Sequence, residues 1–414
     1  MLLYQFQFRK NGLATFKALS IMMISIMVLT QIQAQNEWNQ FRGSSRNGVV
    51  NQANFPEIIP TSVAEPVWSK DIGSGFSEVV LSDNKAYVFY ADTLHANYTY
   101  LAALEIGNGE ELWKTRVDSM WVEVDGWGHG PRSTPAIDDE AVYCLSGYGQ
   151  FVAIDKDDGS ELWKVNLPEE FGTAILRWGF STSPLLIADV VILETGGGEK
   201  QAFTAFDKKT GKIVWSTGTG MASYNSPMVA DINNQKQIIF ANDTMLYALN
   251  PTGALLWQYR MPLRGPMAMP VFIAPNRIFV SSVSNTGSFV LEVNDTIATE
   301  VLKSPTMQNN WSSSCYYQGY LYGFSKAKLQ CVSVESGEMT WGKRGFGKGS
   351  LIIVGDKLVA LSDQGKIIVT EATPESYQEV ASFQTLTGKA WTAPSYSDGK
   401  LFVRNLSKVA CYKF

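Results

Sequence analysis

The chain has 414 residues, of which 45% are hydrophobic and 18% are charged. Ordinary soluble domains carry about 25% charged residues, so this composition supplies ample apolar material for a core and excludes an intrinsically disordered chain. The formal charge is −5, from 34 Lys and Arg against 39 Asp and Glu. This balance argues against a nucleic acid partner, because affinity for phosphates requires a positively charged surface.

The N-terminal segment has the pattern of a secretory signal peptide. Arg9, Lys10 and Lys17 precede an apolar run over residues 18–29, and small residues follow up to Ala34. The run is shorter than the roughly twenty residues that a membrane-spanning helix needs. We expect cleavage after Ala34, with no lipid-anchoring cysteine at that point and no transmembrane segment afterwards. The predicted location is therefore periplasmic or secreted.

The 4 cysteines are far apart in strand-like runs, at positions 144, 315, 331 and 411. Small buried hydrophobes are the simplest interpretation of isolated cysteines in such runs. Neither a CxxC pair nor a Cys/His spacing typical of a metal site occurs. We therefore predict no metal centre.

An internal repeat dominates the middle of the chain. In residues 101–113, 151–163 and 203–215, an apolar strand ends in an acidic residue, Gly follows, and Trp stands four residues after Gly. Gly253 with Trp257 and Gly337 with Trp341 keep the same offset. The acidic side chain can bond the backbone that follows it, and Gly supplies a positive φ, so each copy predicts a turn between two strands.

Two more strand-like runs precede each copy, so each unit has four short strands, as in a propeller blade. The last strands of the chain, residues 401–403 and 409–412, lack an outer partner, whereas residues 66–70 form an outer strand without a blade. Joining them closes the ring and removes an exposed edge. The fourth strands are expected near Trp68, Trp113, Trp163, Trp215, Trp257, Val301, Trp341 and Val380.

The predicted fold is therefore all-β: an eight-bladed β-propeller of four-stranded antiparallel blades, closed by an N-terminal strand, with seven blades as the alternative. The domain boundaries that follow are a signal peptide over residues 1–34, an N-terminal cap over 35–65 and the propeller over 66–414. We expect a monomer.

The A-x-D-x-x-x-G-x-x-x-W units resemble the PQQ-like repeats of BamB-like and quinoprotein alcohol dehydrogenase-like propellers. Residues 38–43, WNQFRG, followed by Arg46-Asn47-Gly48, are similar to the mature start of many exported members. The resemblance covers residues 37–414 and implies the fold and a place in the cell envelope. For a BamB-like member it implies an envelope protein partner.

For a quinoprotein, the resemblance implies PQQ with calcium, a vicinal cysteine pair over the cofactor, and a Glu, Asn and Asp set for the metal. No two cysteines are adjacent in this chain, and no such carboxylate set is evident. We therefore expect no cofactor, with PQQ and calcium kept as the alternative.

In propellers of this kind, the residues just before each first strand line one mouth of the ring. Small-residue and Pro signatures such as 133–135, 181–184 and 225–227 mark these points, and basic or aromatic residues stand ahead of them. Two long connections, 118–130 and 168–179, add further side chains, and binding residues concentrate on such loops. The expected ligand-binding residues are Trp127, His129, Arg132, Arg177, Trp178, Tyr224, Arg264, Trp311, Lys348 and Trp391.

This set suits a ligand with an anionic group and an apolar or sugar-like face. We expect a binding or scaffolding protein of the envelope with either an envelope protein partner or an acidic, sugar-like ligand. The alternative is an enzyme at the same mouth, either a lyase acting on acidic oligosaccharide or a divergent quinoprotein oxidoreductase. In the lyase, His129, Arg132 and Tyr224 would form the proton-abstracting site. A further alternative is that the Trp side chains only plug the channel.

Overall fold

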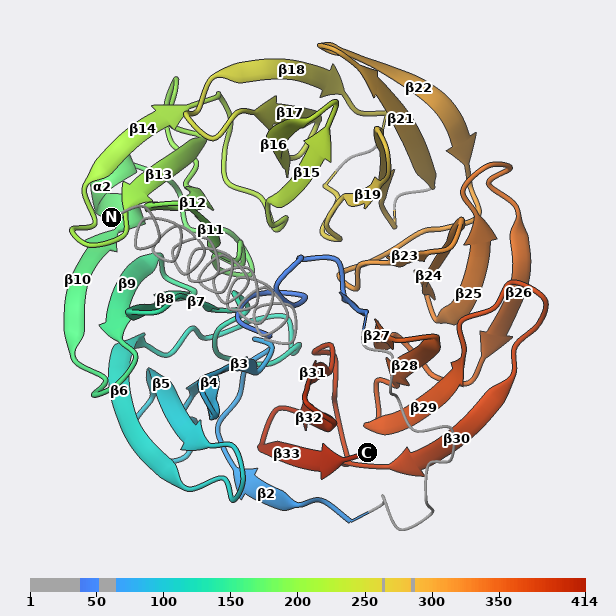
Figure 1. Ribbon diagram of the computed structural model, residues 1–414. Helices are drawn as coiled ribbons and strands as arrows, with labels where there is room; N and C mark the ends of the chain where they lie inside the picture. Colours follow the sequence, from blue (N-terminus) through green and yellow to red (C-terminus); the bar gives the residue numbers. More distant parts are fainter. Residues whose placement is uncertain (1–37, 52–64, 263–264, 284–286) are drawn as a thin grey trace, which may run out of the picture.

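The computed structural model describes residues 38–51, 65–262, 265–283 and 287–414. Eight sheets stand around a central channel like the blades of a propeller (Figure 1). The predicted all-β, eight-bladed architecture is therefore confirmed, and the seven-bladed alternative is wrong. The predicted signal peptide, much of the predicted cap and Arg264 lie outside the described residues.

Within a blade the strands follow one another along the chain from the channel to the rim, and each pairs antiparallel with the next. Blade 1 is formed by β3 (Val80–Ser82), β4 (Lys85–Ala91), β5 (Tyr98–Glu105) and β6 (Glu111–Ser119), and blade 2 by β7 (Ala136–Ile137), β8 (Ala141–Leu145), β9 (Gln150–Asp155) and β10 (Glu161–Asn166). Blade 3 is formed by β11 (Leu185–Ile187), β12 (Val190–Glu194), β13 (Phe203–Asp207) and β14 (Ile213–Thr217). Blade 4 is formed by β15 (Met228–Ile232), β16 (Gln235–Ala241), β17 (Met245–Leu249) and β18 (Leu255–Arg260).

Blades 5 to 7 repeat this order. They are formed by β19 (Val271–Ile273), β20 (Arg277–Ser281), β21 (Ser288–Asn294) and β22 (Ile297–Ser304); β23 (Cys315–Tyr317), β24 (Tyr320–Ser325), β25 (Lys328–Ser333) and β26 (Met339–Arg344); and β27 (Ser350–Val354), β28 (Lys357–Leu361), β29 (Lys366–Glu371) and β30 (Glu379–Gln384). A short helix, α2 (Leu167–Phe171), follows the second blade.

Blade 8 closes the ring with strands from both parts of the chain. The last three strands, β31 (Ser395–Ser397), β32 (Lys400–Arg404) and β33 (Lys408–Lys413), are completed by β2 (Trp68–Asp71) as the outer strand (Figure 1). Trp68 lies opposite Cys411 in the antiparallel register. The predicted closure by an N-terminal strand is thus confirmed, and the edge of β33 is covered.

The Gly and Trp of the repeat contact each other between neighbouring blades. Gly211 has a φ of 68°, and a Cβ added to it would lie 2.7 Å from the ring of Trp163, in the blade before. The Trp163 indole donates a hydrogen bond to Lys208 O at 2.7 Å, just ahead of that glycine. The same contact occurs between Gly109 and Trp68, between Gly159 and Trp113, and between Gly253 and Trp215. The motif therefore encodes the packing of one blade on the next as well as the turn.

The described part of the cap, residues 38–51, crosses the channel (Figure 1). Its strand β1 (Val49–Val50) adds to β27 in parallel. Arg42 donates to the carbonyls of Ser313 and Ser314 at the sixth blade. Arg46 donates to Ser183 O and Pro184 O at the third blade and to Pro227 O at the fourth. The cap is thus fixed to opposite sides of the ring.

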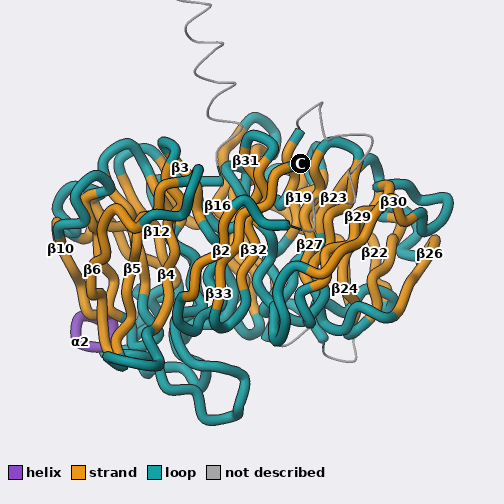
Figure 2. The backbone as a smooth tube through the Cα atoms, turned by 90° about the horizontal axis from the view of Figure 1, so that it is seen from below, coloured by secondary structure: helices purple, strands orange, loops and turns teal. Residues whose placement is uncertain are grey.

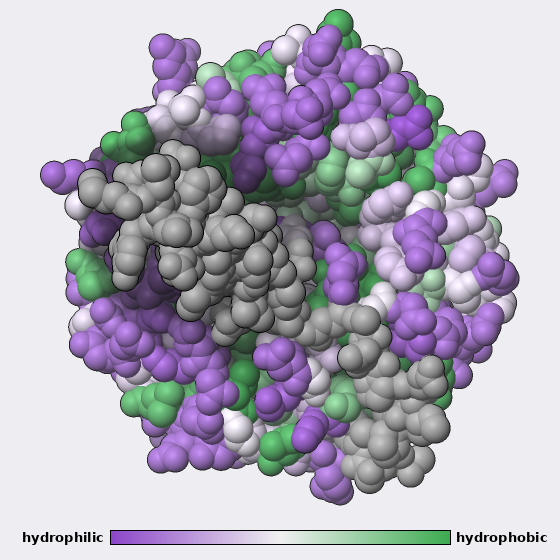
Figure 3. Space-filling view, in the orientation of Figure 1, coloured by the Kyte–Doolittle hydropathy of each residue, from purple (hydrophilic) through white to green (hydrophobic). Residues whose placement is uncertain are grey.

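The surface of the face drawn in Figure 3 is mostly hydrophilic, with apolar side chains scattered along the rim. The inner strands are buried, and every residue of β27 and β28 is at most 8% exposed. Within the described ranges, no helix has the length and apolar character that crossing a membrane requires.

Candidate functional site

A cavity of about 290 Å³ lies at one mouth of the channel. It is bordered by residues just before or at the start of the first strand, and all eight blades contribute. The connections that carry these residues run from the outer strand of one blade to the first strand of the next. They lie on the side of the ring where α2 lies, which is at the bottom of Figure 2, and the longest loops project from that side. Phe41 and Arg42 of the cap also line the cavity, so it ends at the cap.

Hydroxyl side chains tie the blades together around this mouth. The backbone N–H groups of Glu78, Thr134 and Ser183 each donate to a hydroxyl of the next blade, Thr134 Oγ1, Ser183 Oγ and Ser226 Oγ, at 2.9 to 3.0 Å. The small-residue signatures in the sequence therefore have a geometric role. They fix the spacing of the blades where the cavity wall is formed.

Aromatic rings form much of the wall. Trp391 lies at the centre of this group, with its ring centroid 4.2 Å from Trp311, 5.6 Å from Trp127 and 5.9 Å from Phe76. The Trp178 and Tyr224 rings form a second pair at 5.0 Å. Such a surface offers flat apolar faces to a bound ring.

Two cations, Lys348 and Arg132, border the same wall, and neither forms an ion pair within 4.0 Å in the described part of the chain. Lys348 Nζ lies 5.2 Å from the Trp311 ring centroid. The Arg132 guanidinium lies 5.2 Å from the Phe76 ring and donates to the carbonyls of Gly130 and Gly128. Burial lowers the pKa of Arg132 to about 10. Among the described residues, no carboxylate lies within 4.0 Å of either cation, and Glu123 attracts Arg132 from a greater distance. Neither cation is therefore engaged in a direct ion pair that a bound anion would have to displace.

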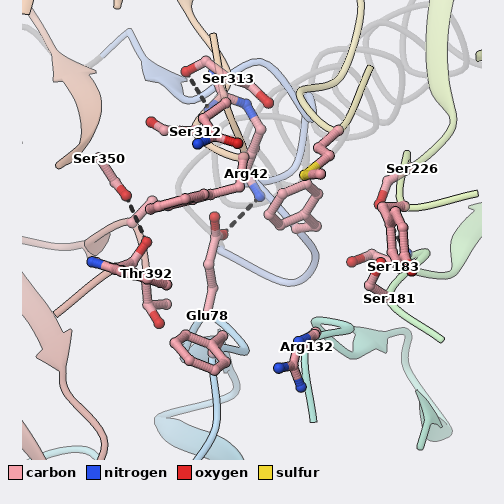
Figure 4. Close-up of a pocket in the computed structure, with 18 of the residues that line it drawn as sticks. Arg42, Glu78, Arg132, Ser181, Ser183, Ser226, Ser312, Ser313, Ser350 and Thr392 are labelled. Atoms are coloured by element: carbon pink, nitrogen blue, oxygen red, sulfur yellow. Dashed lines mark hydrogen bonds between the residues drawn. The ribbon is translucent and has the colours of Figure 1, made fainter. Parts of the chain in front are cut away.

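A buried carboxylate, Glu78, stands beside the cap (Figure 4). Its Oε2 accepts hydrogen bonds from the Trp38 indole at 3.0 Å and from Arg42 N at 2.8 Å. Its Oε1 has no hydrogen-bond partner among the described residues. Burial raises the pKa of Glu78 to about 7, against the lowering effect of these hydrogen bonds and of Arg42 and Arg46.

The structure brings most of the expected ligand-binding residues to this cavity. The members that line it are Trp127, Arg132, Trp178, Tyr224, Trp311, Lys348 and Trp391. Arg177 does not line it, because its guanidinium binds Asp125 through two hydrogen bonds of 2.7 and 2.9 Å. His129 does not line it either, because its Nδ1 accepts a hydrogen bond from Glu123 N at 3.1 Å. Arg132 and Tyr224 thus share the cavity without the imidazole.

Other lining residues, such as Ser181, Ser183 and Ser226, lie at the small-residue signatures that are expected to mark the mouth. No such expectation covered five residues of the lining: Phe41, Arg42, Phe76, Glu78 and Met267. A signal existed for two of them. Residues 76–78, Phe-Ser-Glu, occupy in the first blade the place that 132–134, Arg-Ser-Thr, occupy in the second, as the hydrogen bond from Ser77 Oγ to Ser133 O shows. Aligning the first strands of all blades would have placed Phe76 and Glu78 at the mouth.

The donor set does not fit calcium-bound PQQ. Across the described ranges, no group of three or more His, Cys, Asp and Glu residues has the geometry to hold a metal ion. Glu78 is the one carboxylate among the described residues that lines the cavity, and its Oε2 already binds the cap. Cys144, Cys315, Cys331 and Cys411 are buried and unpaired.

Similarity to known proteins identifies the family of this chain. The family described as outer membrane protein assembly factor BamB matches residues 97–343. BamB of Yersinia pestis is 24% identical over 312 residues, which cover 71% of this chain and 75% of that protein. BamB of Escherichia coli (strain K12) is 32% identical over 99 residues, which cover 23% of this chain and 24% of that protein. The match with this relative thus spans about a quarter of its length.

Solved structures share the architecture at low identity. BamB from Moraxella catarrhalis superposes with a TM-score of 0.63 at 15% identity, covering 84% of this chain and 99% of that one. Quinohemoprotein alcohol dehydrogenase from Comamonas testosteroni gives 0.66 at 14% identity, covering 92% and 81%. At such identities the likeness shows the fold alone. The match to the BamB family extends over more than half of the residues of this chain. The chain therefore belongs to the BamB-like family of PQQ-repeat β-propellers.

Proposed function

We propose that this protein is a binding or scaffolding propeller of the cell envelope that holds a small anionic ligand with an apolar or sugar-like face. The observation that carries the proposal is the cavity at the channel mouth. Four Trp side chains line it beside Arg132 and Lys348, two cations without a carboxylate partner in the described structure. Aromatic faces and unpaired cations together recognise such a ligand.

Binding is favoured over catalysis by what surrounds the cavity. A proton-abstracting site needs a base within hydrogen-bond reach of its substrate. His129 is turned toward Glu123 N, and Glu78 is engaged by the cap. Burial raises the pKa of Tyr224, so its phenol keeps its proton, and its oxygen accepts a hydrogen bond from Trp178 N at 3.2 Å. These groups suit recognition.

Native mass spectrometry tests the proposal, because it detects a bound ligand by mass alone. Purified protein is incubated with the small-molecule fraction of an envelope extract, and the mass of any retained ligand is measured. We expect one ligand on the native protein and its loss from the double variant Arg132→Ala/Lys348→Ala. Lys209→Ala serves as the control, because this exposed lysine lies outside the cavity. A ligand retained equally by all three proteins would place binding elsewhere.

The envelope assignment and the protein partner need separate measurements. The family's printed description, outer membrane protein assembly factor, motivates both. Cell fractionation should recover the protein with periplasmic or outer-membrane material, and crosslinking in intact cells should join it to a defined envelope protein. Recovery in the cytoplasm would contradict the assignment, and the absence of any crosslinked partner would contradict the scaffolding role.

A further inference from the structure

We infer that the cavity binds the terminal residue of an acidic oligosaccharide end-on, with its carboxylate toward Arg132 and Lys348 and its hydroxyls toward the cap side. This inference rests on the proposed function and specifies its ligand class. Three features of the described structure carry it: the closed end of the cavity, the aromatic and hydroxyl side chains of its lining, and the balance of charge on its wall.

The cap makes the cavity a dead end. Arg42 binds carbonyls at the sixth blade, and Arg46 binds carbonyls at the third and fourth, so the segment between them crosses the ring. Phe41 and Arg42 themselves line the cavity. A polymer therefore has no path through the channel past the described cap. A ligand chain enters by one end and stops there.

The size of the cavity agrees with a chain end. Its volume of about 290 Å³ lies near the lower limit of small-molecule sites, which span roughly 300 to 1,000 Å³. A terminal sugar fills such a space, whereas the following sugars must remain among the loops outside. Affinity should then depend on the terminal residue and change little with chain length.

The aromatic and hydroxyl lining identifies the kind of ring. The Trp311 and Trp391 rings, whose centroids are 4.2 Å apart, form an apolar surface on which the C–H face of a sugar ring can lie. Hydroxyl side chains also line the cavity, among them Ser181, Ser183 and Ser226. Each hydroxyl can both donate and accept, so such a lining matches a polyhydroxylated ring.

The charge of the wall selects an acidic sugar over a neutral one. Arg132 and Lys348 have no carboxylate within 4.0 Å among the described residues, whereas Arg177 outside the cavity is already paired with Asp125. A neutral sugar would leave both cavity cations without a direct ion pair, with Arg132 attracted only by the more distant Glu123. A uronate carboxylate forms charge-assisted hydrogen bonds with either.

Titration calorimetry with defined sugars tests the inference. The probes are galacturonic acid, its trimer and hexamer, and a neutral galactose trimer. We expect one site per protein, affinities of the three acids within about fivefold per molecule, and at least tenfold weaker binding of the neutral trimer. Lys348→Ala and Arg132→Ala should each weaken trimer binding about tenfold or more, while Lys209→Ala binds as the native protein does.

Other outcomes would overturn the inference in distinguishable ways. Equal affinity for acetate would reduce the site to an anion site, and binding of PQQ without any uronate would make the occupant a planar quinone. Affinity that rises in proportion to chain length would indicate binding along a chain rather than at its end. Native mass spectrometry can detect a ligand from the envelope extract that depends on Arg132 and Lys348. If it does so and no uronate binds in the calorimeter, this inference fails while the proposed function stands.

Discussion

Gly211 shows why the repeat tolerates so little change at the residue scale. Its φ of 68° is costly for any residue with a Cβ, and the added atom would also lie 2.7 Å from the Trp163 ring. Gly172 has nearly the same φ, 62°, but nothing lies within 4 Å of its Cβ position. Comparing substitutions at the two glycines therefore separates the energetic cost of a positive φ from the cost of a clash with the Trp ring.

We expect Gly211→Ala to lower the free energy of unfolding by about 3 kcal/mol and Gly172→Ala by about 1 kcal/mol. The difference is the displacement of the Trp163 ring, which is held by its hydrogen bond to Lys208 O. Guanidinium denaturation followed by Trp fluorescence measures both values. Equal losses of unfolding free energy in the two variants would mean that the Trp163 ring can move away from the added Cβ at no energetic cost. Gly would then be required only for the turn.

Glu194 gives a second prediction at the residue scale, concerning pH. Its Oε2 accepts from Ser223 Oγ at 2.8 Å, and Oε1 is unpaired within the described structure. Burial raises the pKa of Glu194 from 4.5 to about 8. The folded protein thus keeps a proton that the unfolded chain releases near pH 4.5, so this side chain makes the protein less stable as the pH rises from there to about 8.

Glu194→Gln should remove that contribution, because the amide has no proton to lose. The two proteins should have similar denaturation midpoints at pH 5. Between pH 5 and 8, the free energy of unfolding of the native protein should fall by about 1.4 kcal/mol more per pH unit than that of the variant. Denaturation at four pH values from 5 to 8 gives the comparison. Parallel curves would show that Glu194 ionises freely in the folded state.

At the scale of elements, the cap depends on arginine rather than on strand pairing. Its strand β1 has only two residues. Arg46 is 4% exposed and donates to three backbone carbonyls, at 2.8, 2.8 and 3.2 Å. Burial lowers the pKa of Arg46 to about 9, opposed by the nearby Glu78. The favourable hydrogen bonds must therefore outweigh the cost of burying a cation.

Arg46→Ala should leave these carbonyls unpaired and lower the free energy of unfolding by about 3 kcal/mol or more. The loss should concentrate in the cap, which the remaining contacts of Arg42 and β1 hold weakly. Hydrogen exchange measured by mass spectrometry should show faster exchange in peptides covering residues 38–51 than in peptides of the outer strands. Uniformly faster exchange would mean that the cap and the ring unfold together.

At the scale of the whole molecule, the period of the sequence predicted the ring, but not the details of its mouth. The constant offset of Gly and Trp placed five of the outer strands, and the spacing of the repeat placed the degenerate ones near Val301 and Val380. The need to close the ring placed the eighth, at Trp68. Arg42 had no repeat to reveal it, since the cap lies outside the pattern, whereas Glu78 could be placed only by aligning the first strands of all blades. Arg177 depends on a partner, Asp125, that is 52 residues away, so its direction could not be inferred from its own segment.

The closure of the ring gives the last prediction. In seven blades the outer strand follows its neighbour along the chain, whereas β2 reaches β33 from a distant part of the sequence. The Trp68 side chain holds it there: its ring centroid lies 6.0 Å from that of Phe402, and its indole donates to Ile106 O at 2.9 Å. Losing this side chain should therefore release β2 locally before the ring unfolds.

Thiol labelling can detect that release. Cys411 lies opposite Trp68, is fully buried, and has its pKa raised to about 12 by burial, so it reacts only when β2 moves away. In Trp68→Ala, we expect a maleimide to label Cys411 at least tenfold faster than in the native protein, with Cys144 unchanged. Trp163→Ala, which removes the matching side chain from a continuous blade, should leave Cys411 protected. If Cys411 stays protected in Trp68→Ala, the backbone pairing of β2 with β33 suffices to keep the ring closed.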